Sequence, residues 1–122
     1  MDAERSRESC QQEASGADLA SVHSEGEIEY IALLTEGELA MLGGIDTRRG
    51  SEWNWYDSST WDYTSWNSGE PNNLRDEYCL DIKFQYAGGW NDISCSSIGR
   101  HEEYVCKMTG ACVCTTPAHK VG

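Results

Sequence analysis

Apolar residues in the first third of the chain recur at helical spacing. A short helix is predicted over about 4–13, and a clearer one begins after Ser24. Ser24-Glu25-Gly26-Glu27 has the form of a capping box, in which the Ser hydroxyl and the second Glu carboxylate each satisfy an amide at the helix start. The stripe that follows is expected to face the core and consists of Ile28, Ile31, Ala32 and Leu39.

The rest of the chain alternates with the two-residue period of strands. We expect strands at 41–45, 52–56, 79–84, 90–95 and 103–108. Between about Ser58 and Tyr78 the alternation stops, which predicts a loop of roughly twenty residues, a length that is usually functional in a compact domain. Helices first and strands later predict an α+β domain, and 122 residues suit one domain.

Charge narrows the range of partners. The chain carries 21 acidic residues against nine Lys and Arg, a net charge of -12 that repels nucleic acid phosphates and anionic lipids. No apolar stretch approaches the roughly 18 residues needed to cross a bilayer, and residues 1–5 lack the features of a signal peptide. We therefore expect a soluble protein, with neither nucleic acid nor membrane as a partner.

Six cysteines favour a disulfide framework in an oxidising compartment, and so a secreted protein. Their spacing contains no Cys-x-x-Cys pair of the kind that zinc sites use. Sequence order leaves all 15 connectivities open for six cysteines. They stand at Cys10, Cys79, Cys95, Cys106, Cys112 and Cys114.

Oxygen-bearing side chains concentrate in and after the long loop, in three short runs: Glu70-Pro71-Asn72, Asp76-Glu77 and Asn91-Asp92. Calcium prefers carboxylate and amide oxygens, so these runs predict a calcium site if the loop folds back onto the strand at 90–95. Two vicinal sugar hydroxyls could complete the coordination, because carboxylates accept hydrogen bonds and Asn amides donate them. The expected metal ligands are Glu70, Asn72, Glu77, Asn91 and Asp92, and the first four of these are also expected to contact sugar.

Other polar and aromatic residues suggest no catalytic chemistry. His23, His101 and His119 have no acid or nucleophile at an informative spacing, so no enzyme is expected. The tryptophans are expected in the core, with Trp61 and Tyr63 as the candidates for stacking on a sugar.

Several motifs in the same order resemble C-type lectin-like domains, specifically their mannose-type sugar binders. The similarity covers about 5–108 and includes segments 16–24 and 66–73, Trp90-Asn91-Asp92-Ile93-Ser94-Cys95 and Tyr104-Val105-Cys106. It implies disulfides Cys10–Cys106 and Cys79–Cys95 and the calcium ligands given above. Glu-Pro-Asn implies preference for mannose, glucose, N-acetylglucosamine or fucose, whereas Gln-Pro-Asp implies galactose.

Departures from the family pattern limit the expected site to a single calcium. Tyr78 occupies a position where binders of two or more calcium ions have Asp, and Gly50 stands where a Glu is expected, although Asp46 and Asn73 match auxiliary ligands. The loop before Cys79 is one residue shorter than usual, which leaves Glu77 as the ligand and Asp76 as its alternative.

The domain is expected to span 1–108, without the strand that the family places before the first helix. The tail, 109–122, is expected to fold back after the turn at 109–110 and to cover the edge of the last strand with a strand at 111–115. Cys112 or Cys114 is expected to link two chains into a homodimer, with free thiols as the alternative.

Together these features predict a secreted, calcium-dependent binder of mannose-type glycans in innate recognition of microbial surfaces. The alternative is a calcium-independent protein-binding or ice-binding module on the same fold.

Overall fold

Two helices and two antiparallel sheets make up the described part of the chain, which confirms the expected α+β class. The computed structural model describes residues 3–47, 52–72, 77–84, 88–96, 103–108 and 115–117, the last of these by backbone alone. In chain order the elements are α1 (Ala3–Glu13), β1 (Ala17–Leu19), α2 (Glu25–Thr35), β2 (Ala40–Asp46), β3 (Trp53–Trp55), β4 (Cys79–Lys83), β5 (Gly89–Ile93), β6 (Val105–Met108) and β7 (Thr115–Pro117).

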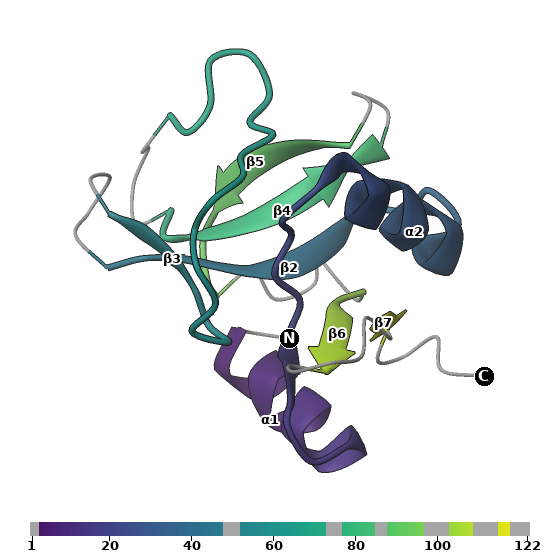
Figure 1. Ribbon diagram of the computed structural model, residues 1–122. Coiled ribbons are helices and arrows are strands. Elements are labelled where there is room, and N and C mark those ends of the chain that lie inside the picture. Colours follow the sequence, from purple (N-terminus) through teal and green to yellow (C-terminus); the bar gives the residue numbers. More distant parts are fainter. Residues whose placement is uncertain are drawn as a thin grey trace.

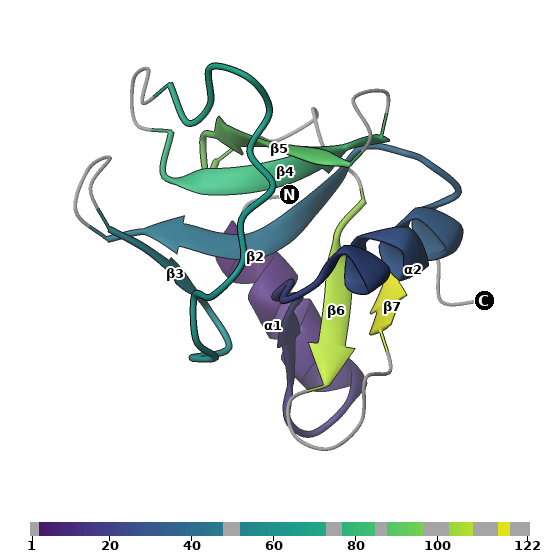
Figure 2. The same cartoon turned by 45° about the horizontal axis from the view of Figure 1, so that its top comes forward.

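The larger sheet has the strand order β3-β2-β4-β5 and the smaller one β1-β6-β7. In Figure 1 the larger sheet lies above α1 and the smaller sheet, and α2 flanks both at one side. Figure 2 shows β6 and β7 side by side between the two helices. β5 is one of the two edge strands of the larger sheet, and the long loop passes beside it.

Alternation along the larger sheet divides the core into two clusters. Leu80, Ile82 and Trp90 pack with Ile28 and Ile31 of α2. The opposite side chains, among them Ile93 and Cys79, pack in a second cluster with Leu19, Tyr104 and the Ala3 end of α1. The sheet therefore buries apolar side chains on both faces.

Helix α2 begins at the predicted cap but departs from the prediction in two details. Ser24 Oγ accepts from the Glu27 amide at 3.2 Å, whereas the Glu27 carboxylate accepts from the amide of His23, one residue before the expected partner. The helix ends at Thr35, because Glu36 turns into the left-handed region with φ 55°, so Leu39 lies beyond the helix and not on its stripe.

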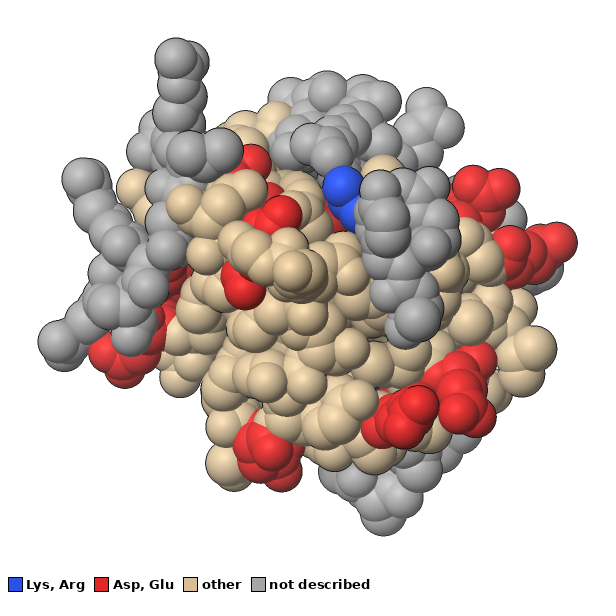
Figure 3. All heavy atoms as spheres, turned by 90° about the horizontal axis from the view of Figure 1, so that it is seen from above, with Lys and Arg blue, Asp and Glu red and all other residues tan. Residues whose placement is uncertain are grey.

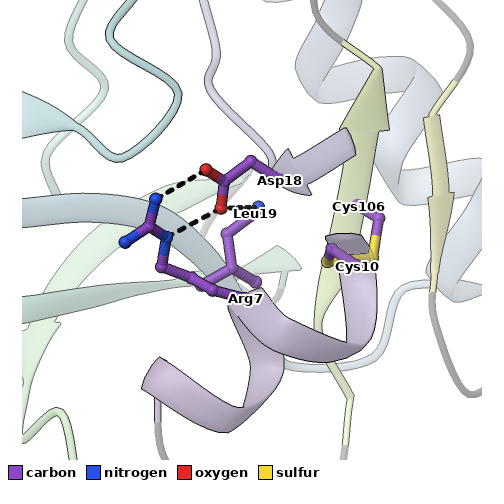
Figure 4. The surroundings of a disulfide bond; sticks show 5 residues. All are labelled: Arg7, Cys10, Asp18, Leu19 and Cys106. Carbon is purple, nitrogen blue, oxygen red and sulfur yellow. Dashed lines mark hydrogen bonds and ion pairs between the residues drawn. A yellow bond between two sulfur atoms is a disulfide. The ribbon is translucent and has the colours of Figure 1, made fainter. Parts of the chain in front are cut away.

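Helix α1 is held to the small sheet by covalent and ionic contacts (Figure 4). Cys10 forms a disulfide with Cys106 of β6, and Arg7 makes a two-pronged ion pair with Asp18 of β1, both N–O distances being 2.9 Å. The three-residue strand β1 was not predicted, since all three of its residues are buried and it shows no alternation.

Strand β6 is paired on both sides. β1 lies antiparallel on one edge and β7 on the other, where Lys107 is paired with Thr115 and Val105 with Pro117. The predicted strand at 111–115 falls, apart from Thr115, outside the described residues, as do Cys112 and Cys114.

Candidate functional site

The long loop returns to the open edge of β5. Trp90 donates its amide to the carbonyl of Ser65 at 2.7 Å, and the amide of Asn67 donates to the Trp90 carbonyl at 2.9 Å. A tight turn follows, in which Glu70 donates its amide to the Asn67 carbonyl at 2.9 Å and Gly69 has a φ of 83°. The loop is therefore fixed on the strand just before Glu70-Pro71-Asn72.

Tryptophan rings hold the rest of the loop in place. The rings of Trp61 and Trp55 lie 4.5 Å apart between centroids, and Trp66 lies 5.7 Å from Trp90. Trp61 and Tyr63 both pack against the core cluster of α2, so these two candidates for sugar stacking instead anchor the loop. Large aromatic surfaces can replace secondary structure as the source of order in such a loop.

The Glu70-Pro71 peptide bond is cis, and Asn72 lies between two carboxylates. The Asn72 amide is 3.1 Å from Oε1 of Glu70 and 3.1 Å from Oδ1 of Asp92, and it donates to both. One backbone N–H thus joins the loop to β5. Asp92 is fully buried and lies opposite Leu80 in the β4–β5 ladder.

The other two expected ligands lie around this junction. Glu77 is half-buried and close enough to act on the charge of Glu70. Asn91 and Glu70 both line a cavity of about 510 Å³, together with Asn67, Ser68 and Lys83. Cys79–Cys95, the second disulfide that the resemblance implied, ties the start of β4 to the residues after β5. The five expected ligands therefore lie in one region of the fold.

Burial and neighbouring carboxylates change the acidity of Glu70. Its pKa is raised from 4.5 to about 7, first by burial, then by a hydrogen bond and charge repulsion from Asp92, with a smaller contribution from Glu77. The Asn72 amide acts in the opposite direction by stabilising the carboxylate. Such a site is short of positive charge, which is the environment that a hard cation relieves.

The donor set suits calcium only if the Asn amides take part. In the part of the chain that the structure describes, no three Asp, Glu, His or Cys side chains converge tightly enough to hold a metal by themselves. The oxygens of Asn72 and Asn91 would have to complete the set with the carboxylates of Glu70, Glu77 and Asp92.

Of the positions considered for auxiliary or alternative calcium ligands, the structure describes Asp46. Asp46 is buried on β2, where its carboxylate accepts from the Glu52 amide at 3.4 Å and its own amide donates to the Tyr78 carbonyl at 2.8 Å. Asn73, Asp76 and Gly50 lie outside the described residues.

A second polar cluster was missed from the sequence. His23 has no acid or nucleophile at an informative spacing in the sequence, yet in the fold its Nδ1 lies 2.7 Å from Oδ1 of Asp62 and its Nε2 lies 3.0 Å from Oγ of Ser59. No local signal could have found this, because 36 and 39 residues separate the partners.

Asp62, His23 and Ser59 follow each other as the acid, histidine and serine of a catalytic triad do, but the hydrogen bonds of Ser59 do not suit a nucleophile. Ser59 Oγ is 2.5 Å from a carboxylate oxygen of Asp57, so the single hydroxyl proton is donated there. The Ser59 hydroxyl is therefore directed at Asp57 and not at His23, whose ring joins the residues just before α2 to the loop. His23 is a structural contact of the loop.

Comparison with known proteins identifies the family. The family model of the Lectin C-type domain matches residues 1–114. The chain belongs to the C-type lectin domain family. Its fold is correspondingly the C-type lectin fold, and none of its described helices has the length and apolar character to span a membrane.

Relatives include both lectins and antifreeze proteins. The chain is 35% identical over 109 residues to a lectin of Pleurodeles waltl, covering 84% of this chain and 62% of that protein. It is 36% identical over 98 residues to a C-type lectin mannose-binding isoform of Notechis scutatus scutatus, covering 73% of this chain and 61% of the relative. The chain thus spans less than two thirds of the length of these relatives.

Two solved antifreeze proteins share the fold. A Ca2+-dependent type II antifreeze protein in its Ca2+-free form superimposes with a TM-score of 0.70 and 30% identity, covering 79% of this chain and 77% of the other. A calcium-independent type II antifreeze protein superimposes with a TM-score of 0.69 and 27% identity, covering 78% of this chain and 71% of the other. Lectins and antifreeze proteins thus share this fold.

Proposed function

We propose that this chain is a calcium-dependent carbohydrate-binding domain of the mannose type with a single calcium site. The observation that carries the proposal is the Asn72 amide held between Glu70 and Asp92, beside a cavity that Asn91 also lines. This backbone N–H brings Glu70-Pro71-Asn72 of the loop to Asn91-Asp92 of β5, and ligands of one ion must lie together in this way.

The proposed ligands are the carboxylates of Glu70, Glu77 and Asp92 and the amide oxygens of Asn72 and Asn91. Bound calcium would offer open coordination positions to two neighbouring sugar hydroxyls. Around these hydroxyls the carboxylates of Glu70 and Glu77 accept hydrogen bonds, whereas the amide nitrogens of Asn72 and Asn91 donate them. The order Glu then Asn within the loop favours mannose, glucose, N-acetylglucosamine or fucose.

A single calcium is proposed because the auxiliary positions are incomplete. Tyr78 provides a phenol where a second site needs a carboxylate. The Asp46 carboxylate is buried and already accepts a hydrogen bond from Glu52.

The setting that we propose is extracellular recognition of microbial glycans in innate defence. Disulfides persist in oxidising compartments, which supports secretion. One shallow sugar contact gives an affinity on the order of millimolar, so useful binding requires several sites presented together. A homodimer through Cys112 or Cys114 would supply such presentation.

Retention on mannose-agarose tests the function directly. We expect the chain to bind the resin in calcium and to elute with a chelator. Glu70→Gln with Asn72→Asp should move the preference toward galactose, because donors and acceptors around the diol exchange places. Glu29→Gln, an exposed change on α2, serves as the matched control and should not alter retention. Passage of the wild-type chain through the column unretained would oppose the proposal.

The similarity to antifreeze proteins supports one alternative, a calcium-independent protein-binding or ice-binding module. Thermal hysteresis of the purified chain separates ice binding from sugar binding. Ice activity that is unchanged by a chelator, together with no sugar retention, would favour the alternative.

A further inference from the structure

Lys83 occupies a specific place in the wall of the cavity beside Glu70. In the β4–β5 ladder Lys83 is opposite Gly89 and Asp81 is opposite Asn91. Since side chains alternate along strands, Lys83 and Asn91 share one face of the sheet as diagonal neighbours, with Cα atoms about 7–8 Å apart. Both line the cavity together with Glu70.

Gly89 leaves the position opposite Lys83 without a side chain, and the loop fills it. A Cβ at Gly89 would collide with the side chain of Asn67, which therefore lies directly over this glycine. Asn67 on the loop and Asn91 on β5 therefore line the same cavity as Lys83, and Glu70 is the acidic side chain among its described lining residues.

The Lys83 charge has no partner in the described part of the chain, whereas other basic residues are paired. Arg7 binds Asp18, and Lys107 lies 2.6 Å from Oε2 of Glu27. None of the described carboxylates forms an ion pair with Lys83, although the chain has 21 acidic residues and the face of Figure 3 displays many of them. An ammonium at the wall of a cavity and not bound to a nearby acid is available to an anionic ligand.

We propose that Lys83 makes this cavity a subsite for an anionic substituent of the bound sugar, either a sulfate ester or a carboxylate. The proposal rests on the proposed sugar-binding function. The ammonium donates charge-assisted hydrogen bonds to the substituent, and the side-chain amides of Asn67 and Asn91, which line the same cavity, donate further ones. The ligand class is therefore acidic glycans in addition to neutral mannose-type ones.

The test compares mannose, mannose 6-sulfate and mannuronic acid, which differ at carbon 6 and keep the same ring hydroxyls. Titration calorimetry in calcium should show about a three- to tenfold tighter dissociation constant for one or both acidic sugars, the range expected of one charge-assisted hydrogen bond. The sulfate and carboxylate arms identify which substituent the subsite takes. Lys83→Gln should abolish the preference, and Lys83→Arg should retain it.

Arg5→Gln is the matched control, since it removes the same charge from an exposed position on α1 and should leave the preference intact. Equal affinity of the wild type for all three sugars, or a preference that survives Lys83→Gln, overturns the subsite. Lys83-dependent binding of the acidic sugars without any binding of mannose supports the subsite and overturns the mannose-type function. No binding of any sugar overturns both.

Discussion

The carboxylates of Glu70 and Asp92 are held together without a counter-charge among the groups that set the Glu70 pKa. Burial and the neighbouring acids raise this pKa to about 7, and one backbone amide opposes them. In the calcium-free protein Glu70 is therefore about half protonated at pH 7, and its protonated form can donate to Asp92. The proton does here what a cation would do, which is to keep two oxygens in contact.

This residue pair gives the first prediction. In calcium-free protein, carboxyl NMR should show Glu70 titrating near 7, and Asp92→Asn should lower its pKa toward 4.5, because the largest charged neighbour is gone. Since the folded pKa is the higher one, Glu70 stabilises the fold at low pH, and this contribution is lost as pH rises between about 4.5 and 7. Glu29→Gln should change neither the pKa of Glu70 nor the pH dependence of stability. A wild-type Glu70 that titrates at its ordinary value would contradict the observed contact.

At the scale of elements, the site depends on the contact between the loop and β5. Asn67 contributes twice, because its backbone amide bonds to Trp90 and its side chain covers Gly89. The strand supplies the space and the loop supplies the amide. Neither element forms the cavity wall alone.

Gly89→Ala should therefore displace the Asn67 side chain. We expect a loss of about 1–3 kcal/mol in the free energy of unfolding from overpacking, with a larger relative loss in sugar affinity. Adding Asn67→Ala should restore most of the stability but not the affinity. Chemical denaturation and titration calorimetry measure the two effects. Gly26→Ala in α2, where the added Cβ would make only an ordinary contact with Ser24 Oγ at 3.8 Å, is the control and should stabilise the fold by roughly 0.5–1 kcal/mol. Equal losses in both glycine variants would argue against a specific role for Gly89.

Elements with a local signal were predictable from the sequence, and the others were not. Ser24 marks the start of α2 because capping is local, and Gly37 is an equally local stop signal that the prediction did not use: Glu36 and Gly37 both turn into the left-handed region and end the helix before Leu39. The candidate ligands could be grouped from residue type alone. The places of Lys83 and His23 could not, since they depend on strand register and on partners that are distant in sequence.

At the scale of the whole molecule, the two disulfides among the described residues act at different ranges. Cys10–Cys106 links residues 96 apart and holds α1 to the small sheet, whereas Cys79–Cys95 spans only 16 residues beside the site. A crosslink that closes a longer loop restricts the unfolded chain more. One bond thus serves mainly stability, and the other mainly the site.

The two disulfides should differ in their effects on stability and on sugar affinity when each is removed in turn. Replacing Cys10 and Cys106 by Ala should lower the free energy of unfolding by about 4–5 kcal/mol, and replacing Cys79 and Cys95 by about 3 kcal/mol. Sugar affinity, measured at low temperature where both variants remain folded, should fall more in the second variant. An equal fall in affinity would show that the short disulfide has no special relation to the site.

The return of the loop to Trp90 also bears on how this chain behaves among copies of itself. An exposed edge strand offers its backbone to any passing strand and so invites aggregation. Here the N–H and C=O of Trp90 are already engaged by Ser65 and Asn67. The contact that holds the sugar-binding segment in place thus also blocks sheet growth at that residue, so a mutation that frees the loop would expose the domain to self-association as well as cost it a ligand.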